Sequence, residues 1–170
     1  KLISSIIGQQ LSVKAANTIF SRVKNLCNGV SPQNIISLAD DELRNAGVSR
    51  PKIKYIMHLS KEIINNRINL NSLFFLSDEE VVSELTKIKG IGRWTAEMFM
   101  IFSLGRLDIF STSDAGLRRA IKWLYNVDDS IEISLLNGIS DNWKPYRSIA
   151  SLYLWESINK GLINNSSIFI

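Results

Sequence analysis

The chain of 170 residues lacks the residue types that several classes of site require. It has one cysteine, Cys27, and one histidine, His58. A single cysteine excludes a disulfide framework and any cysteine-rich zinc or iron–sulfur site. The sequence has no run of about 18 uncharged apolar residues, which predicts that no segment spans a membrane. It also has no internal repeat and no low-complexity linker, so we expect one domain over residues 1–170.

Helical patterns dominate the sequence. Apolar residues make up 45% of the chain and recur at helical spacing, whereas strand-like pieces are short and lack hairpin turns. We therefore expect an all-α protein with about eight to ten helices. The expected helix caps are Ser12, Ser31, Asp40, Ser49 and a capping box from Ser77 to Glu80, and later helices are expected at residues 93–104, 114–125 and 145–159.

Basic residues concentrate in two segments of the chain. Residues 1–39 contain four Lys or Arg and no Asp or Glu, and residues 85–125 contain seven against three. Each of these segments has a net charge of +4, and the two remaining segments are each −2, so the whole chain is +4. Clustered positive charge is compatible with a nucleic-acid partner at the two basic segments but does not require one.

Residues 85–96 have the most specific local pattern, Leu-Thr-Lys-Ile-Lys-Gly-Ile-Gly-Arg-Trp-Thr-Ala. Gly90 and Gly92 flank one isoleucine between two apolar helices, which predicts a tight helix–hairpin–helix turn. The backbone N–H groups after Gly90 begin a helix, where an anion such as a phosphate is favoured. For an isolated Gly-X-Gly, an ordinary corner without a ligand is the alternative. Three basic side chains beside the turn favour the phosphate, namely Lys87, Lys89 and Arg93.

The order of these motifs resembles the helix-hairpin-helix DNA glycosylases, and within them the 3-methyladenine DNA glycosylase II branch. The resemblance implies a two-lobed all-α fold with the active cleft between the lobes. Residues 30–113, which include the hairpin, would form a helical barrel, and residues 1–29 would join residues 114–170 in the second lobe. The matching segments are residues 7–12, 46–52, 85–96, 108–114, 117–120 and 143–147, together with Trp155.

The resemblance places the catalytic carboxylate at Asp114. This residue opens a predicted helix, where the positive end of the helix dipole stabilises an anion. Cleavage of an N-glycosidic bond passes through a cation-like sugar, so a carboxylate beside the sugar lowers the barrier. On position alone Asp114 is a helix N-cap, and one carboxylate can serve both purposes. Asp108 is the nearest rival acid, and we assign it as a loop or capping acid.

Trp94 occupies a hairpin position at which relatives that also cut the DNA backbone, such as endonuclease III, have a lysine that forms a Schiff base. The tryptophan implies a monofunctional glycosylase that uses water. It would stack on a flipped alkylated base, whose positive charge favours contact with an aromatic ring, while a core aromatic is the alternative. The other implied pocket residues are Met98, which replaces a tyrosine common in the family, Phe110 and Trp143.

Residues 9–12 match the corner at which the family inserts a side chain into the DNA minor groove. We take Gln10 as this wedge, and a polar corner between two helices is the alternative. Ser49, Arg50 and Lys52 are a second predicted phosphate contact. The full set of predicted DNA contacts is Gln9, Gln10, Leu11, Ser12, Ser49, Arg50, Lys52, Lys87, Lys89, Gly90, Ile91, Gly92, Arg93 and Thr95. The main-chain carbonyls of Thr86, Ile88 and Ile91 are implied to bind a monovalent cation, Na⁺ or K⁺.

The implied function is removal of alkylated purines such as 3-methyladenine from double-stranded DNA by base flipping and hydrolysis. The product would be an abasic site for base excision repair, and catalysis would need no cofactor. We expect a monomer that binds DNA and no membrane, in the cytoplasm at the nucleoid of a prokaryote or in the nucleus of a eukaryote. Two alternatives stay open: a glycosylase for deaminated or mismatched bases, and a non-catalytic helix-hairpin-helix module that only binds DNA.

Overall fold

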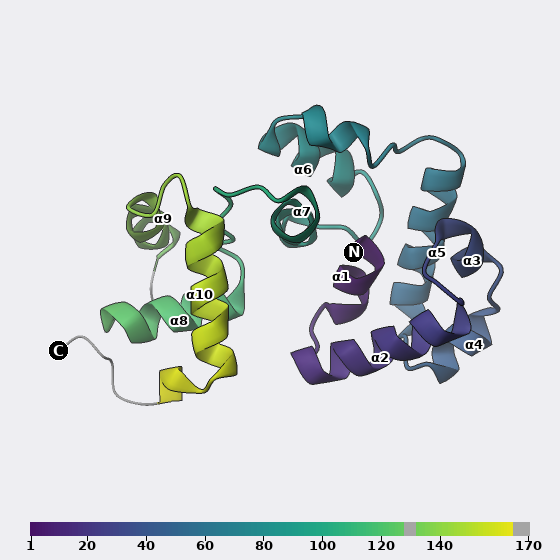
Figure 1. Cartoon of the computed structure of the whole chain (residues 1–170), viewed down its shortest axis with the longest axis horizontal. Helices are drawn as coiled ribbons and strands as arrows, with labels where there is room; N and C mark the ends of the chain where they lie inside the picture. The colour runs from purple at the N-terminus through teal and green to yellow at the C-terminus, as the bar shows by residue number, and fades with distance from the viewer. Residues whose placement is uncertain (128–131, 165–170) are drawn as a thin grey trace. The chain divides into compact units, whose positions relative to one another are not determined.

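The computed structural model of the chain describes residues 1–127 and 132–164. These residues form ten α-helices, two 3₁₀ helices and one π-helical turn with no strand, which confirms the all-α prediction (Figure 1). Within the described ranges, no helix has both the length and the apolar character needed to cross a membrane. The elements are α1 (Leu2–Gly8), α2 (Val13–Leu26), α3 (Pro32–Ile36), α4 (Asp40–Asn45), α5 (Arg50–Ile64), η1 (Ser72–Phe75), α6 (Asp78–Thr86), α7 (Arg93–Phe99), η2 (Met100–Leu104), α8 (Ala115–Tyr125), α9 (Ile133–Asp141), α10 (Arg147–Asn159) and η3 (Leu162–Asn164).

Several helices begin at the caps that the sequence predicts. The Ser77 hydroxyl accepts a hydrogen bond from the Glu80 N–H at 3.4 Å, and the Glu80 carboxylate accepts one from the Ser77 N–H at 2.8 Å. The predicted capping box is therefore present. Ser12 and Ser31 cap α2 and α3 through their hydroxyls, and Ser49 holds the N-cap position of α5 without a side-chain hydrogen bond. The predicted starts of these four helices are confirmed.

The predicted cap Asp40 is wrong by one residue. Ala39 is the N-cap of α4, and its N–H donates to the Glu42 carboxylate at 2.8 Å. The Glu42 carboxylate, in the first turn, satisfies the N–H of Ala39, so α4 begins without a capping side chain at its N-cap. The apolar helix predicted at residues 93–104 is α7, continued by the π-helical turn η2.

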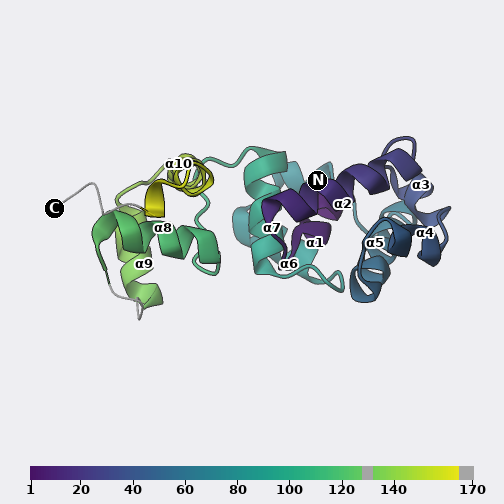
Figure 2. The same cartoon turned by 90° about the horizontal axis from the view of Figure 1, so that it is seen from below.

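The chain divides into two compact units, Lys1–Leu104 and Gly105–Ile170. In the first unit α1 contacts α2, α5 and α7, while α5 also contacts α3 and α4, and α6 contacts α7. Figure 2 shows α1 beside α7. The predicted lobes grouped α1 with residues 114–170, whereas these contacts include it in the first unit. The predicted cleft between two lobes stays a prediction.

The second unit has its own apolar core around α8. Leu136 in this core comes from α9, a helix that the sequence pattern did not assign. The preceding piece, residues 131–133, has a strand-like pattern; Ile131 lies outside the described residues, and Ile133 begins the helix. Burial of Leu136 against the other helices explains why a helix forms there. The fully buried members of the core and their neighbour on α10 are Leu117, Ala120, Ile121, Leu136 and Leu154.

The predicted hairpin is present between α6 and α7. The Ile91 N–H donates to the Ile88 carbonyl at 3.0 Å, which closes the turn. Gly90 has a φ of +92°, and a Cβ there would lie 2.1 Å from Cγ of Tyr55. The ring of Tyr55 in α5 therefore packs directly on the Gly90 backbone. Gly92 differs, because its φ is −96° and no atom lies within 4 Å of a Cβ built there.

Gly90→Ala is expected to lower the free energy of unfolding by about 2–4 kcal/mol, because the methyl group overlaps the Tyr55 ring and the left-handed backbone is strained. Gly92→Ala is the matched control. It adds the same methyl group where the structure has space, and we expect a change within about 1 kcal/mol. Chemical denaturation of both variants measures the difference. Equal losses would contradict the packing of Tyr55 on Gly90.

Arg147, the first residue of α10, fastens the loop of residues 105–113. Its Nε donates to Asp108 Oδ1 at 2.8 Å, and its Nη2 donates to Asp108 Oδ2 at 3.0 Å. Asp108 Oδ1 also accepts the Arg147 N–H at 3.3 Å, so the carboxylate helps to cap α10. Asp108 therefore lies where the sequence predicts a loop or capping acid. The pair ties to α10 the loop that leads to Asp114.

The hydrogen bonds from Arg147 lower the pKa of Asp108 below its ordinary value. Because the pKa is lower in the folded state, the pair stabilises the fold above the ordinary value of about 3.9, and this contribution is lost as the pH falls below it. We expect the melting temperature of the unmodified protein to fall more steeply than that of Asp108→Asn between about pH 5 and pH 2. Thermal melts across this range measure the effect. Parallel curves for the two proteins would show that the pair contributes nothing.

Candidate functional site

Asp114 ends the loop after Gly105 and begins α8. Its Oδ1 accepts the Leu117 N–H at 2.8 Å, so Asp114 is the predicted N-cap of an 11-residue helix. The same oxygen accepts the Nε1–H of Trp155 in α10 at 3.2 Å. Asp114 is 9% exposed. Two donors and the positive end of the helix dipole therefore hold this nearly buried carboxylate in one orientation.

Gly116 provides the room that this carboxylate occupies. A Cβ at Gly116 would lie 3.0 Å from Asp114 Oδ1, 3.3 Å from Ile158 Cδ1 and 3.6 Å from Trp155 Cδ1. A larger residue would press on both the acid and its indole donor. Sequence reasoning missed Gly116, although a signal was present. A glycine within a helix lowers the stability of the helix by about 1 kcal/mol relative to alanine. Its presence therefore indicates that a larger side chain would not fit at that position.

Sequence reasoning also missed the role of Trp155. The residue matched the family pattern but was assigned no part in the site. Its partner Asp114 lies 41 residues earlier in the chain, a separation at which no helical spacing links the two. Nothing in the sequence alone indicates this hydrogen bond.

The predicted pocket aromatics of the second unit lie together. The ring centroids of Phe110 and Trp143 are 5.6 Å apart with an interplanar angle of 74°, an edge-to-face contact. Both rings pack against the core around α8. In the first unit, Trp94 is half-buried in the first turn of α7, and Met98, one turn later, is buried. The pocket role of these four residues stays a prediction.

Acidic residues accompany the basic residues of the hairpin. Arg93 Nη2 lies 2.8 Å from Glu79 Oε2, and this pair lowers the pKa of Glu79. Lys87 pairs with Glu84. Lys89 is exposed and forms no ion pair within the described part of the chain. Of the three basic side chains predicted to contact a phosphate, Lys87 and Arg93 thus have ion-pair partners in the protein, and the phosphate role of the hairpin stays a prediction.

The corner between α1 and α2 presents the predicted wedge at the surface. Gln10 is exposed and has a φ of +56°, a left-handed conformation that residues other than glycine seldom adopt. The Leu11 N–H donates to the Gly8 carbonyl at 3.1 Å, and Leu11 itself is 41% exposed. Ser12 is engaged as the cap of α2. The wedge role of Gln10 stays a prediction.

Gln9 and Lys52 direct their polar ends into the protein. Gln9 Nε2 donates to the Gly90 carbonyl and to the Thr95 hydroxyl, both at 3.0 Å. Lys52 Nζ donates to the carbonyls of Ile7 at 2.8 Å and Gln9 at 2.6 Å. The predicted contacts of these two side chains with DNA stay predictions, and their hydrogen bonds join three separate segments of the first unit.

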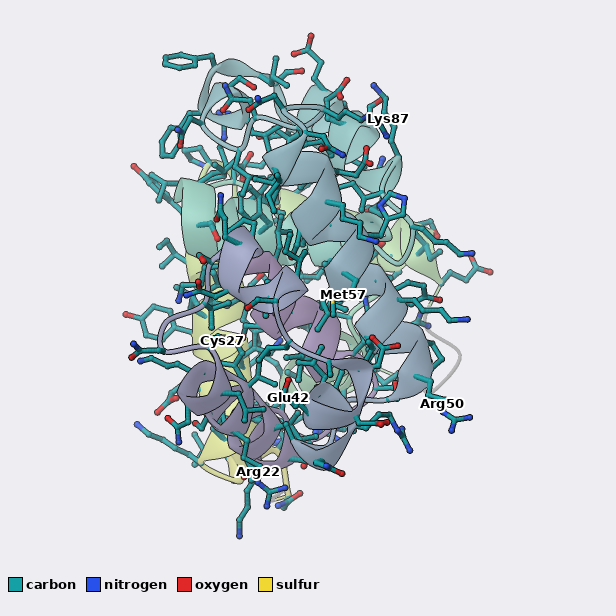
Figure 3. The ribbon with its side chains drawn as sticks, turned by 90° about the vertical axis from the view of Figure 1, so that its right-hand side faces the viewer. Arg22, Cys27, Glu42, Arg50, Met57 and Lys87 are labelled. Carbon is teal, nitrogen blue, oxygen red and sulfur yellow. The ribbon has the colours of Figure 1, made fainter. Side chains whose placement is uncertain are left out.

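The start of α5, the second predicted phosphate contact, also has exposed residues. Ser49 and Arg50 are exposed, and Figure 3 shows the Arg50 side chain pointing away from the ribbon. They are therefore accessible, whereas the ammonium group of Lys52 is engaged within the protein.

The three carbonyls predicted to hold a monovalent cation have lone pairs that no described hydrogen bond uses. The Ile88 carbonyl accepts one hydrogen bond, from the Ile91 N–H, and each carbonyl oxygen has two lone pairs. The carbonyls of Thr86 and Ile91 accept no hydrogen bond from any described residue. This donor set fits Na⁺ or K⁺, which prefer neutral oxygen ligands. Over residues 1–127 and 132–164, no three His, Cys, Asp or Glu side chains gather as a metal site would require.

Sequence comparisons connect this arrangement to known proteins. A family model described as "HhH-GPD superfamily base excision DNA repair protein" matches residues 3–145. DNA-3-methyladenine glycosylase 1 of Schizosaccharomyces pombe is 34% identical over 161 residues, which cover 92% of this chain and 71% of that protein. A Bacillus subtilis relative is 35% identical over 92% of this chain but only 58% of its own length. The chain thus spans little more than half of that relative.

Solved structures agree with the sequence matches. The crystal structure of a DNA-3-methyladenine glycosidase from Bacillus halodurans is 46% identical, with a TM-score of 0.77 over 92% of this chain and 73% of the other. The S. pombe 3-methyladenine DNA glycosylase in complex with abasic DNA is 34% identical, with a TM-score of 0.86 over 92% and 78%. Because the family pattern covers most of the residues and the relatives share the fold, this chain belongs to the HhH-GPD superfamily of base excision DNA repair proteins.

Proposed function

We propose that this protein is a monofunctional DNA glycosylase that removes alkylated purines from double-stranded DNA. The observation that carries the proposal is the nearly buried Asp114 carboxylate, which the Leu117 N–H and the Trp155 indole hold in place. Relatives named DNA-3-methyladenine glycosylase support the substrate class. The complex of one relative with abasic DNA supports DNA as the partner.

Asp114 would act on the sugar of the flipped nucleotide. In the proposed reaction the bond between C1′ and the base nitrogen breaks, and its electron pair leaves with the base. The oxygen of a water molecule then bonds to C1′ and loses a proton. A fixed carboxylate stabilises the positive charge that develops on the sugar and can orient the water. A purine alkylated on a ring nitrogen already carries positive charge, so its departure needs no proton from the protein.

Trp94 determines which nucleophile is available. A glycosylase that also cuts the DNA backbone needs an amine to form a Schiff base, and an indole cannot form one. Water is then the nucleophile, and an abasic site is the product. The indole instead offers a flat surface to which a positively charged base is attracted by cation–π interaction.

The hairpin and the corner would hold the DNA. We assign a phosphate to the backbone N–H groups from Gly92 onward, at the start of α7, because the Ile91 N–H already donates to the Ile88 carbonyl. Lys89 would lie beside that phosphate, and we assign the minor-groove wedge to Gln10. A monovalent cation on the carbonyls of Thr86, Ile88 and Ile91 would add positive charge beside that phosphate when bound.

Asp114→Asn is expected to lower the single-turnover release of 3-methyladenine from methylated DNA by about 100-fold or more, because the carboxylate charge is lost. Asparagine retains an oxygen for the Leu117 N–H, so the N-cap and the melting temperature should be preserved. Asp108→Asn makes the same change at the rival acid, and we expect a loss below about 10-fold. Release by Asp114→Asn at the unmodified rate would overturn the catalytic assignment.

A panel of substrates distinguishes the alternatives. Single-turnover release from DNA containing 3-methyladenine, 7-methylguanine, hypoxanthine or uracil identifies the base. Release confined to hypoxanthine or uracil would favour a glycosylase for deaminated bases. Binding to every duplex without any release would favour the non-catalytic module.

Gly116→Ala is expected to lower base release by about 10- to 100-fold, because the new methyl group displaces the Asp114 carboxylate and the Trp155 indole from their present positions. Gly138→Ala is the matched control, since Gly138 is also a helical glycine and no atom lies within 4 Å of a Cβ built there. The control should release base at the unmodified rate. Equal activities of the two variants would show that Gly116 does not position the acid.

A further inference from the structure

Lys52 ends in a hydrogen-bonding arrangement that the proposed function does not use. Its ammonium group donates to two main-chain carbonyls at the end of α1, Ile7 at 2.8 Å and Gln9 at 2.6 Å. Burial lowers the pKa of Lys52. A positive charge at the carboxyl end of a helix satisfies orphan carbonyls and interacts favourably with the helix dipole. An ammonium group has three N–H donors, of which this contact uses two.

Gln9 is held a second time, through its side chain. Its amide Nε2 donates to the Gly90 carbonyl and to the Thr95 hydroxyl, 81 and 86 residues later in the chain. Thr95 is buried, so this contact lies inside the hairpin. The backbone of Gln9 is thus bound by α5, and its side chain is bound by the hairpin.

The next residue is the exposed Gln10, whose φ is +56°. A left-handed conformation at a residue other than glycine costs about 1 kcal/mol or more, so neighbouring contacts must hold it. The anchors at Gln9 stand immediately before this residue, and the Leu11 N–H bond to the Gly8 carbonyl closes the turn after it. These contacts hold the backbone on both sides of Gln10.

We propose that Gln9 and Lys52 are positioning residues that join the wedge corner to the phosphate-binding hairpin as one prearranged unit, rather than contacts with DNA. The inference rests on the proposed function, because it assigns a purpose to the wedge. Insertion of Gln10 into the duplex must occur in register with the grip of the hairpin on the backbone. Anchoring both elements to the same residue removes the free-energy cost of ordering them separately when DNA binds.

Lys52→Met tests the role of the ammonium group, and Lys54→Met is the matched control. Both lysines lie in α5, and Lys54 is exposed, so each variant removes one charge from the same helix. The readout of base flipping is the fluorescence of 2-aminopurine placed at the target position of a duplex, which rises when the base leaves the stack. We expect Lys52→Met to reduce this rise and the single-turnover release of 3-methyladenine at least about 10-fold, whereas Lys54→Met changes neither.

Binding to undamaged duplex and its salt dependence separate this role from a phosphate contact. We expect the two methionine variants to bind undamaged DNA within about twofold of one another, with the same slope of log affinity against log salt. Weaker binding and a slope smaller by about one for Lys52→Met alone would show that Lys52 contacts a phosphate, and would overturn the proposal. A lower melting temperature with unchanged flipping per folded molecule would show a merely structural role, and would also overturn it.

Gln9→Ala tests the other anchor if Lys52→Met folds poorly, and the double variant Gln9→Ala/Lys52→Met tests the coupling of the two anchors if Lys52→Met folds well. Because both side chains hold the same corner, their effects on flipping should be non-additive. We expect the flipping signal of the double variant to lie within about twofold of the signal of the more impaired single variant. Lys52→Arg retains donors for the two carbonyls and should recover part of the flipping signal. Independent effects and no recovery would contradict a shared unit. The 2-aminopurine signal does not require bond cleavage, so an unmodified protein that flips the base without releasing it would count against the proposed chemistry, whereas normal flipping by the Lys52 and Gln9 variants would overturn the positioning role.

Discussion

The chain reversal at Gly90 is the constraint on which the proposed DNA-contacting surface of the first unit depends. Because Gly90 has no side chain, the Tyr55 ring lies against its backbone, and its carbonyl receives the amide of Gln9. Helices α1 and α5 and the hairpin, which are distant in sequence, therefore meet at one residue. The proposed wedge and the proposed phosphate grip share this support, so a disturbance at Gly90 would reach both. The glycine is required by this contact with a neighbouring ring as well as by its positive φ.

Asp114 serves the fold and the proposed chemistry through the same group. Its Oδ1 caps α8 and accepts the indole N–H of Trp155, so the orientation of the carboxylate follows from contacts that also stabilise the second unit. The helix dipole favours the anion there, which is the charge that a cation-like sugar needs beside it. Gly116 makes this arrangement possible at the expense of helix stability, because glycine stabilises a helix about 1 kcal/mol less than alanine does. The glycine two residues after the acid lowers the stability of the helix and leaves room for the acid and its donor.

Part of the positive charge of the hairpin is paired with acidic side chains of the protein itself. Arg93 pairs with Glu79, and Lys87 pairs with Glu84, so part of the local charge orders the protein itself. Lys52, in the adjoining helix, serves the end of α1. The proposed recognition of DNA by oriented backbone N–H groups would then depend less on net charge than the sequence suggests. Fewer phosphate contacts by charged side chains would also weaken non-specific binding, which suits the proposed enzyme, because it must leave undamaged DNA.

The sequence by itself determined the helical class, the hairpin and the N-cap position of Asp114. Each depends on residues only a few positions apart, such as the capping box at Ser77, whose interactions are local. Only the tertiary structure decided which distant groups meet. Trp155 reaches Asp114 across 41 residues, and Gln9 reaches Gly90 across 81. Helical periodicity shows which face of a helix is apolar but not which helix covers it, so these partners, like the helix α9, emerge only once the helices pack.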